Sequence, residues 1–301
     1  MIGDRRSQQG IILIGLMLVL MIAAGTAFLQ QANRSQARQQ ERDAKTTSTL
    51  LTARDALLAR AVLDRNRPGS LPCPDTNDDG IADLAYPNCT AYAGRLPWRT
   101  LDLDDPRDGS GERLWYILSP AFNDGNTAIN TTTATTLTLD GQGGMVALII
   151  APGGALGGQG RPSNNVIDYL DDATAANSNR DGDNNFFSGP SGASFNDRIV
   201  ALDSTSLFAT VSMRLLNEIR QAVSIAGPPL PHADNDNDGL ANPPAANGQF
   251  PFKETAYDLP SSTWPTERWY VALENNAWFP LIAYDRTNAS ISVGGRTITL
   301  P

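Results

Sequence analysis

The first sixty residues are patterned as one continuous helix that is apolar at its start and amphipathic at its end. Residues 11–29, IILIGLMLVLMIAAGTAFL, carry no charge, and nineteen such residues come close to the ~20 that a helix needs to cross a bilayer. Residues 30–64 contain neither proline nor glycine and are rich in Gln, Ala, Arg and Leu, which favour helix. The pattern predicts a membrane segment that continues unbroken into an exposed helix.

The distal part of this helix has an apolar stripe, whereas residues 30–45 are polar all round. The stripe recurs at helical spacing and comprises Leu50, Leu51, Ala53, Leu57, Leu58, Ala61 and Val62. We therefore expect only the distal half to dock on a globular domain. The helix should stop before Pro68 and Gly69, which makes it ~80 Å long at 1.5 Å per residue.

Beyond Pro68 the pattern changes to short runs of β-branched and aromatic residues bounded by Gly, Pro, Asn and Asp, which indicate strands. Three runs precede a second helix, at residues 114–120, 135–141 and 145–152, and four follow it, at 269–274, 279–285, 291–295 and 296–301. The second helix is expected over 204–226, capped by Ser204, Thr205 or Ser206 and ended by Gly227 and Pro228. The fold class is therefore α+β, with a long N-terminal helix and helices laid on antiparallel sheets.

Two stretches of the chain match without a gap. Residues 71–83 read LPCPDTNDDGIAD and residues 230–242 read LPHADNDNDGLAN, 159 positions further on. Each stretch follows a helix and is followed by a tryptophan and then by a Glu-Arg-(Leu)-Trp-Tyr run. In the first copy these are Trp98 and residues 112–118, and in the second copy they are Trp264 and residues 267–273. This order predicts a duplication. The expected parts are a helix over 30–66, a first lobe over 67–203 and a second lobe over 204–301.

The repeated stretches have the ligand spacing of a calcium loop, with oxygen-bearing residues at positions 1, 3, 5 and 9 and a glycine at 6. These residues are Asp75, Asn77, Asp79 and Asp83 in the first copy, and Asp234, Asp236, Asp238 and Asn242 in the second. Position 12 holds Tyr86 or Ala245 where a full EF-hand has Glu. The alternative is a plain turn, because Asp, Asn and Gly also favour turns.

A third stretch, residues 177–185, has the same spacing, with Asn177, Asn179, Asp181 and Asn185 at the ligand positions and Gly182 at position 6. Asp181 is the one carboxylate at these positions, and a turn is the favoured interpretation there. The only cysteines are Cys73 and Cys89. In an exported chain they would form a disulfide worth about 3 kcal/mol; in a cytoplasmic chain they would be two buried thiols.

Charge and composition exclude several functions. A net charge of −9 and a pI near 4.6 argue against a nucleic-acid partner, which requires a basic face. The chain has a single histidine, His232, and neither a paired nucleophile nor a cofactor fingerprint. We therefore expect no enzymatic activity.

A short basic leader ending in Gly10, an apolar segment starting at Ile11 and one long helix leading into a globular domain together resemble a type IV pilin-like protein or a type II secretion pseudopilin. Arg5 and Arg6 should keep the leader, residues 1–10, in the cytoplasm. The resemblance implies cleavage by prepilin peptidase between Gly10 and Ile11 and methylation of the new N-terminus. It also implies a single-pass inner-membrane protein with a periplasmic or extracellular domain, whose partners are other pilin or pseudopilin subunits.

Two residues depart from the family pattern. The first position of the mature chain holds Ile11, where the family usually has an aromatic residue. The fifth position of the mature chain holds Gly15, where the family has a Glu that balances the N-terminal amine of a neighbouring subunit. This resembles minor, tip-located subunits more than fibre-forming pilins. The predicted function is a structural or assembly role as a minor pilin-like subunit of a type IV pilus or type II secretion apparatus. The alternative is a calcium-binding, adhesin-like protein that is signal-anchored, or secreted after cleavage before Phe28, and joins no filament.

Overall fold

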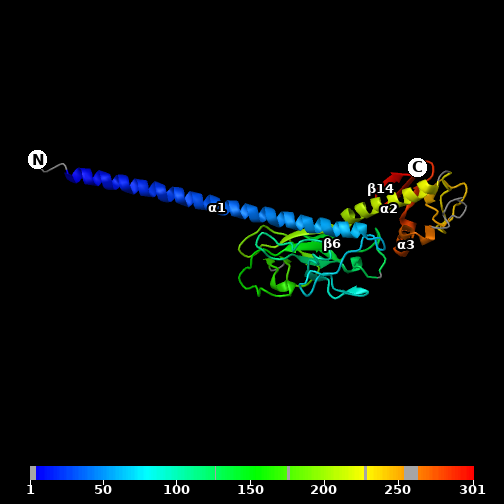
Figure 1. Ribbon diagram of the computed structural model, residues 1–301, viewed down its shortest axis with the longest axis horizontal. Helices are drawn as coiled ribbons and strands as arrows, with labels where there is room; N and C mark the ends of the chain where they lie inside the picture. The colour runs from blue at the N-terminus through cyan, green and yellow to red at the C-terminus, as the bar shows by residue number, and fades with distance from the viewer. Residues whose placement is uncertain (1–4, 126, 175–176, 227–228, 254–263) are drawn as a thin grey trace.

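The computed structural model describes residues 5–125, 127–174, 177–226, 229–253 and 264–301, and confirms the α+β class. Helix α1 (Arg5–Leu63) is a single helix of 59 residues, which spans about 90 Å at 1.5 Å per residue. In Figure 1 its N-terminal part projects far from the globular part, and its C-terminal part lies along it. The absence of helix breakers from residue 30 onward explains why the helix runs on.

The two halves of α1 have opposite environments. Among the side chains that the structure describes, the large apolar ones between Leu16 and Leu29 are exposed, with 57% of Leu16 and 73% of Phe28 accessible. In the docked half, Leu50, Ala53, Leu57 and Ala61 are buried. They follow the predicted spacing, so the expected docking face is confirmed at these four positions, whereas Leu51 remains 37% exposed at the edge of the stripe.

The first sheet has six strands, with β6 at its centre. The order is β3-β4-β6-β5-β9, and β10 also pairs with β6. The strands are β3 (Ala93–Arg95), β4 (Trp115–Leu118), β5 (Leu137–Leu139), β6 (Gln142–Ala151), β9 (Asn185–Phe186) and β10 (Arg198–Asp203). All pairs are antiparallel except β5 with β9. The runs expected at 114–120, 135–141 and 145–152 thus supply β4, β5 and β6.

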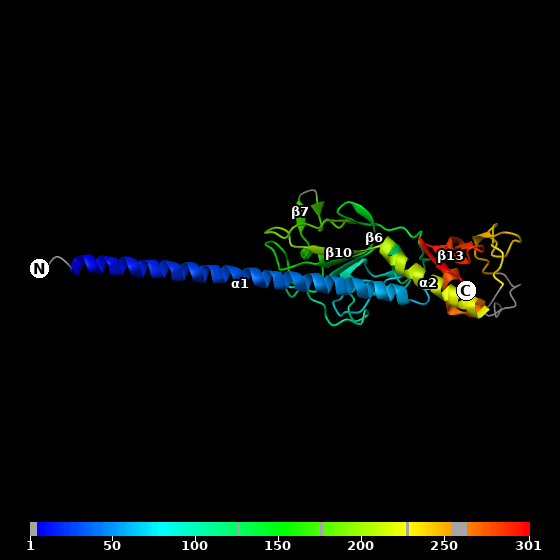
Figure 2. The same cartoon turned by 90° about the horizontal axis from the view of Figure 1, so that it is seen from above.

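Alternation along the strands divides the side chains of this sheet between two faces. Tyr116 and Ile149 are directly opposite in the register and belong to the core that α1 covers. Trp115 and Ile150 are likewise paired, and they face a second cluster with Tyr169. The loops beyond β6 cover that second face. They carry η2 (Val166–Asp168) and the hairpin of β7 (Asp172–Thr174) and β8 (Asn177–Ser178), which Figure 2 shows on the side away from α1.

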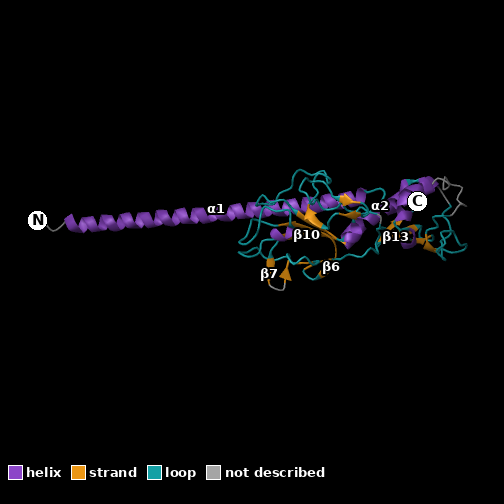
Figure 3. Cartoon of the chain, turned by 90° about the horizontal axis from the view of Figure 1, so that it is seen from below, coloured by secondary structure: helices purple, strands orange, loops and turns teal. Residues whose placement is uncertain are grey.

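Helix α2 (Ser204–Ala226) follows β10 directly and leads to the second sheet (Figure 3). That sheet is antiparallel, in the order β11 (Asn247–Gln249), β12 (Ala283–Asp285), β13 (Ser290–Val293) and β14 (Arg296–Thr299). The start of α2 corrects the expected cap. Asp203 accepts hydrogen bonds from the Ser206 amide at 2.8 Å and hydroxyl at 2.7 Å, because the residue just before a helix is the one placed to satisfy its free amides.

Residues 269–274 were expected to form a strand, and this prediction is wrong. They lie in helix α3 (Arg268–Asn275), which follows the short 3-10 turn η4 (Trp264–Thr266). Tyr270 and Leu273 are buried three positions apart, a helical spacing, and the run contains a single β-branched residue, Val271. Another 3-10 turn, η5 (Phe279–Leu281), precedes β12.

The two lobes share one core. The rings of Phe122 and Phe208 are 6.0 Å apart, and those of Phe208 and Trp278 are 5.9 Å apart, so aromatic packing continues from one lobe into the other. Asn276 adds polar links across the junction. Its Oδ1 accepts from the Ile129 amide at 3.1 Å, and its Nδ2 donates to the Asn66 carbonyl at 3.0 Å. The lobes therefore pack as a single globular body.

Candidate metal-binding loops

The first acidic loop is organised around Asp75, which is 1% exposed. Its Oδ1 accepts hydrogen bonds from the amides of Asn77 at 3.0 Å and Asp78 at 2.7 Å, and its Oδ2 accepts from the Gly80 amide at 2.6 Å. Asp78 and Gly80 both have positive φ, at 67° and 85°, which Gly adopts freely and Asp tolerates better than most residues. The loop is therefore wound around one buried carboxylate.

The second acidic loop repeats this arrangement. Asp234 is also 1% exposed, and its Oδ1 accepts from the amides of Asp236 at 3.3 Å and Asn237 at 2.7 Å. Its Oδ2 accepts from the Gly239 amide at 2.8 Å. Asn237 and Gly239 have φ values of 66° and 93°. The two loops thus share both hydrogen bonds and backbone conformation.

The equivalence extends into the following hairpin. Asp75 exchanges backbone hydrogen bonds with Arg95 at 3.0 and 2.7 Å, and Asp234 exchanges the same pair with Gln249 at 3.0 and 2.7 Å. The glycine before each partner, Gly94 or Gly248, lies so close to the aspartate carbonyl that a Cβ would clash with it. Both lobes therefore require a glycine at this crossing.

The correspondence beyond the loops differs from the one expected from the sequence. The Arg99 amide donates to the Gly80 carbonyl at 2.8 Å, and the Lys253 amide donates to the Gly239 carbonyl at 2.8 Å. Residues 96–99, LPWR, therefore match residues 250–253, FPFK, and the counterpart of Trp98 is Phe252. The predicted pairing of Trp98 with Trp264 is wrong, because equivalent positions are 159 residues apart in the loops but 154 apart here.

The tyrosine of β4 is matched by a tyrosine in β12. Tyr116 donates its hydroxyl to the Pro72 carbonyl at 3.2 Å, and Tyr284 donates to the Pro231 carbonyl at 3.0 Å. Residues 112–118 therefore correspond to the region of β12, and the similar run at 267–273 lies in and just before α3. The insertion of α3 ahead of β12 is the reason that a gap-free comparison selects the wrong partner.

The second loop brings three carboxylates together. Ligand atoms of Asp234, Asp236 and Asp238 all lie within 4.8 Å of one another, with Asp234 buried and the other two exposed. Asn242 holds the loop closed, since its Oδ1 accepts from the Asn235 amide at 2.8 Å and its Nδ2 lies 3.4 Å from Asp236 Oδ2. Three converging carboxylates fit a divalent cation, and calcium prefers such oxygen ligands.

The first loop is less well suited to a cation. Asn77 replaces an aspartate at position 3 and accepts from the Asp79 amide at 3.0 Å, while Asp83 accepts from the Thr76 amide at 2.7 Å and hydroxyl at 2.5 Å. Asp78, at position 4, forms an ion pair with Arg113 at 2.7 Å. Within the described parts of the chain, a group of three close acidic side chains is found in the second loop and not in the first.

Cys73 and Cys89 form a disulfide, as predicted, with their Cα atoms 5.3 Å apart. It links the start of the first loop to the small hairpin of β1 (Leu84–Ala85) and β2 (Asn88–Cys89). The residue matching Cys73 in the second loop is His232, whose Nδ1 is buried and has no hydrogen-bond partner among the described residues. A disulfide indicates a domain outside the reducing cytoplasm.

In the third stretch, residues 177–185, Asn179 stands at a potential ligand position, but its side chain makes hydrogen bonds within the protein. The Asn179 side chain is buried, and its Nδ2 donates to the Phe187 carbonyl at 3.1 Å and to Asp197 Oδ2 at 3.0 Å. Asp181 accepts from the Asp183 amide at 3.2 Å, as in a turn. This arrangement agrees with a turn rather than a metal loop.

Sequence reasoning missed a buried carboxylate at Asp197, which has no motif around it. Its Oδ2 accepts from the Asp171 amide at 2.8 Å, and its Oδ1 is buried with no hydrogen-bond partner in the parts of the chain that the structure describes. Burial, with a smaller contribution from the nearby charge of Asp171, raises the pKa of the Asp197 carboxyl to about 7, although the hydrogen bonds from Asn179 and the Asp171 amide lower it. Nothing in the surrounding sequence, SFNDRIV, distinguishes this aspartate from an exposed one.

Gly10 and Ile11, the predicted processing residues, lie within α1. In the part of the chain that the structure describes, α1 is also the helix that is long and apolar enough to act as a membrane anchor or a signal sequence, with its candidate span beginning at Leu16. Comparisons with protein-family models, with curated proteins and with solved structures find no match to this chain.

Proposed function

We propose that the protein is a minor pilin-like subunit of a type IV pilus or type II secretion apparatus, with a structural or assembly role. The observation that carries this proposal is the division of α1 into an exposed apolar half and a docked half. Residues Leu16 to Leu29 present large apolar side chains that no other described part of the chain covers. At about 25 cal/mol per Å², such a surface needs a bilayer or neighbouring apolar helices to bury it.

Two further features support an inner-membrane subunit with its globular body outside the cytoplasm. The disulfide favours an oxidising compartment, and Arg5 and Arg6 before the apolar run favour a cytoplasmic N-terminus. The long projection of α1 (Figure 1) would hold the globular body away from the membrane surface. Partners in this role are lipid and the apolar helices of other subunits, after prepilin peptidase has removed residues 1–10.

Mass spectrometry of the mature N-terminus tests this proposal. Co-expression with a prepilin peptidase should yield a chain that begins with N-methylated Ile11, and Gly10→Val should block this cleavage. Gly25→Val, inside the apolar run, is the matched control and should leave cleavage intact. A chain beginning at Phe28, or an intact Met1 despite an active peptidase, would contradict the pilin-like assignment.

The second candidate is a calcium-binding, adhesin-like protein that is signal-anchored or secreted and stays outside any filament. The second acidic loop favours this candidate, since Asp234, Asp236 and Asp238 are close enough to share one cation. Fractionation separates the two candidates. A filament subunit should be found in sheared filaments or should crosslink to other subunits through α1, whereas the alternative predicts neither.

We also propose that calcium is the ion that the second loop holds. Asp234, Asp236 and Asp238 would be its carboxylate ligands, with Asn242 keeping the loop closed beside them. A bound divalent cation would offset the repulsion between these carboxylates and so stabilise the connection between α2 and β11. The first loop, with Asp75, Asn77, Asp79 and Asp83, would bind calcium more weakly, because position 3 holds Asn77 and the Asp83 carboxylate is engaged with Thr76.

A further inference from the structure

A hollow of about 820 Å³ opens between α2, the segment after α1, and the turn η4 with α3. Its volume lies within the range of small-molecule sites, roughly 300 to 1,000 Å³. The α2–α3 end of the molecule is opposite the projecting N-terminal helix in Figure 1. The acidic loops do not line this hollow, and the proposed function does not use it.

One end of the hollow is cationic. Arg214 already has partners within the protein. Its Nε donates to Glu218 at 3.0 Å, and its guanidinium donates to the carbonyl of Asp64, just after the end of α1, at 2.7 Å. Arg65 and Arg268 also line the hollow, and neither has an ion pair or side-chain hydrogen bond among the described residues. Two guanidinium groups with no ion-pair partner among the described residues favour an anionic ligand, and carboxylates are suitable partners.

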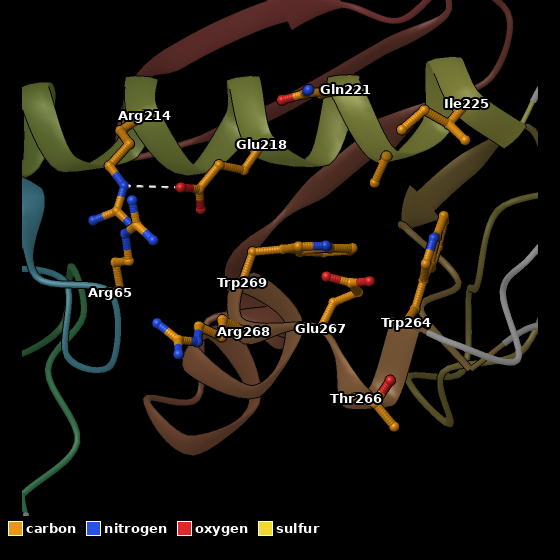
Figure 4. A pocket seen from close by; sticks show the side chains of 11 residues that line it. Arg65, Arg214, Glu218, Gln221, Ile225, Trp264, Thr266, Glu267, Arg268 and Trp269 are labelled. Carbon is orange, nitrogen blue, oxygen red and sulfur yellow. Dashed lines mark hydrogen bonds and ion pairs between the residues drawn. The ribbon is translucent and has the colours of Figure 1, made fainter.

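The other end is aromatic. The rings of Trp264 and Trp269 meet edge to face with centroids 5.5 Å apart. Figure 4 shows the Trp269 ring reaching across the hollow beneath α2, with Ile225 beyond it. The duplication does not account for these residues, because the first-lobe Trp98 is matched by Phe252. Trp264 is largely buried and Trp269 half-buried, so Trp264 supports the platform and Trp269 presents it.

Planar polar groups lie between the two ends. Gln221 and Glu218 face the hollow from α2, and Glu267 lies on the opposite side of the Trp269 ring (Figure 4). Glu218 Oε2 is buried and has no partner within the described chain, and a buried acceptor of this kind is stabilised by a ligand that donates to it. These carboxylate and amide groups can hydrogen-bond to hydroxyl groups, and the Trp269 ring can stack on the C–H face of a sugar ring.

We propose that this hollow binds a carboxylated saccharide. Arg65 and Arg268 contact its carboxylate, Trp269 stacks on a sugar ring, and Glu218 and Gln221 bind hydroxyl groups. An acidic peptide is the competing ligand, because clustered arginines also bind acidic motifs, but it has no sugar ring to stack on Trp269. The assignment is independent of filament membership.

The test is a titration of the full-length protein in a detergent without a sugar headgroup. The probes are tri-galacturonate, sialyllactose and a hyaluronan tetrasaccharide, read by tryptophan fluorescence and by calorimetry. We expect at least one probe to bind saturably at about millimolar concentration or below, and its methyl-esterified form, which lacks the charge, to bind about tenfold more weakly.

Two variants locate the site. Arg268→Gln, at an exposed position of α3, should weaken binding about tenfold, and Trp269→Phe should reduce the fluorescence response while leaving the melting temperature near that of the wild type. Arg296→Gln, an exposed arginine on β14, is the matched control and should bind as the wild type does. The proposal is overturned if none of the three saccharides binds, if Arg268→Gln and Arg296→Gln bind equally well, or if an acidic tripeptide binds more tightly than every saccharide.

Discussion

The substitution Asp238→Asn separates metal binding from loop architecture in the second lobe. Asp238 is exposed, and its Oδ1 accepts a backbone hydrogen bond from the Leu240 amide at 2.7 Å. An asparagine oxygen can accept the same bond, so stability in chelator should change by less than about 0.5 kcal/mol. The substitution nevertheless removes one of the three carboxylates that lie within 4.8 Å of one another.

The expected size of the calcium effect follows from this ligand set. Calcium sites in extracellular modules have dissociation constants of about 0.1 to 1 mM. At about 10 mM calcium, such a site adds about 1.4 to 2.7 kcal/mol to the free energy of unfolding. For a globular body of this size, the melting temperature should rise by about 3 to 10 °C relative to chelator.

The assay is thermal unfolding of each variant in calcium and in chelator, followed by circular dichroism. Asp238→Asn should lose most of the calcium-dependent rise. Asp181→Asn is the matched control. Asp181 also accepts a hydrogen bond from a backbone amide, that of Asp183, but it is the one carboxylate at a ligand position of residues 177–185. This variant should keep the full calcium-dependent rise. The metal assignment is refuted if Asp238→Asn shows the same calcium-dependent rise as the wild type.

Three further predictions concern the architecture. Asp234→Asn leaves an amide group facing the Gly239 amide in place of a carboxylate oxygen 2.8 Å away, so it should cost about 1 to 3 kcal/mol in chelator, measured by urea denaturation; an unchanged midpoint would contradict the structural role of Asp234. Leu57→Ala, fully buried in the docked half of α1, should cost about 2 to 5 kcal/mol, whereas Leu51→Ala, 37% exposed, should cost clearly less, and equal costs would argue against this docking face. Burial raises the pKa of Asp197 from 3.8 to about 7, so the folded state holds a proton that the unfolded state releases. This contribution to stability is fully present below about pH 3.8 and is lost as pH rises through about 7; Asp197→Asn should flatten the decline in stability between these values, and a slope equal to that of the wild type would contradict the assigned pKa.

The long helix and the acidic loops could be predicted from the sequence because the interactions that define them are local. Continuous helix formers determine α1 whatever it packs against, and the apolar stripe at Leu50, Ala53, Leu57 and Ala61 identifies its docking face. The Asp-x-Asn-x-Asp-Gly spacing likewise contains the buried acceptor, Asp75, and the glycine with positive φ, Gly80, that wind the first loop.

Features that depend on distant neighbours were not predicted correctly. Residues 269–274 read as a strand by composition, but they lie in helix α3, which buries Tyr270 and Leu273. The match between Trp98 and Phe252 depends on backbone hydrogen bonds to the two loop glycines, and insertions hide it from a gap-free comparison. Asp197 has a raised pKa because of its surroundings, and these come from separate segments of the chain.

By itself the sequence determined the elements whose interactions lie within a few residues: the continuous α1, the two acidic loops and the cysteine pair in an exported chain. The tertiary structure alone decided which carboxylates converge, which tryptophans line the hollow beside Arg268, and that the two lobes share one core through Phe208 and Asn276. The physical reason is that helix formation and loop winding depend on neighbours along the chain. Convergence of charges, burial and pKa depend instead on groups that folding brings together.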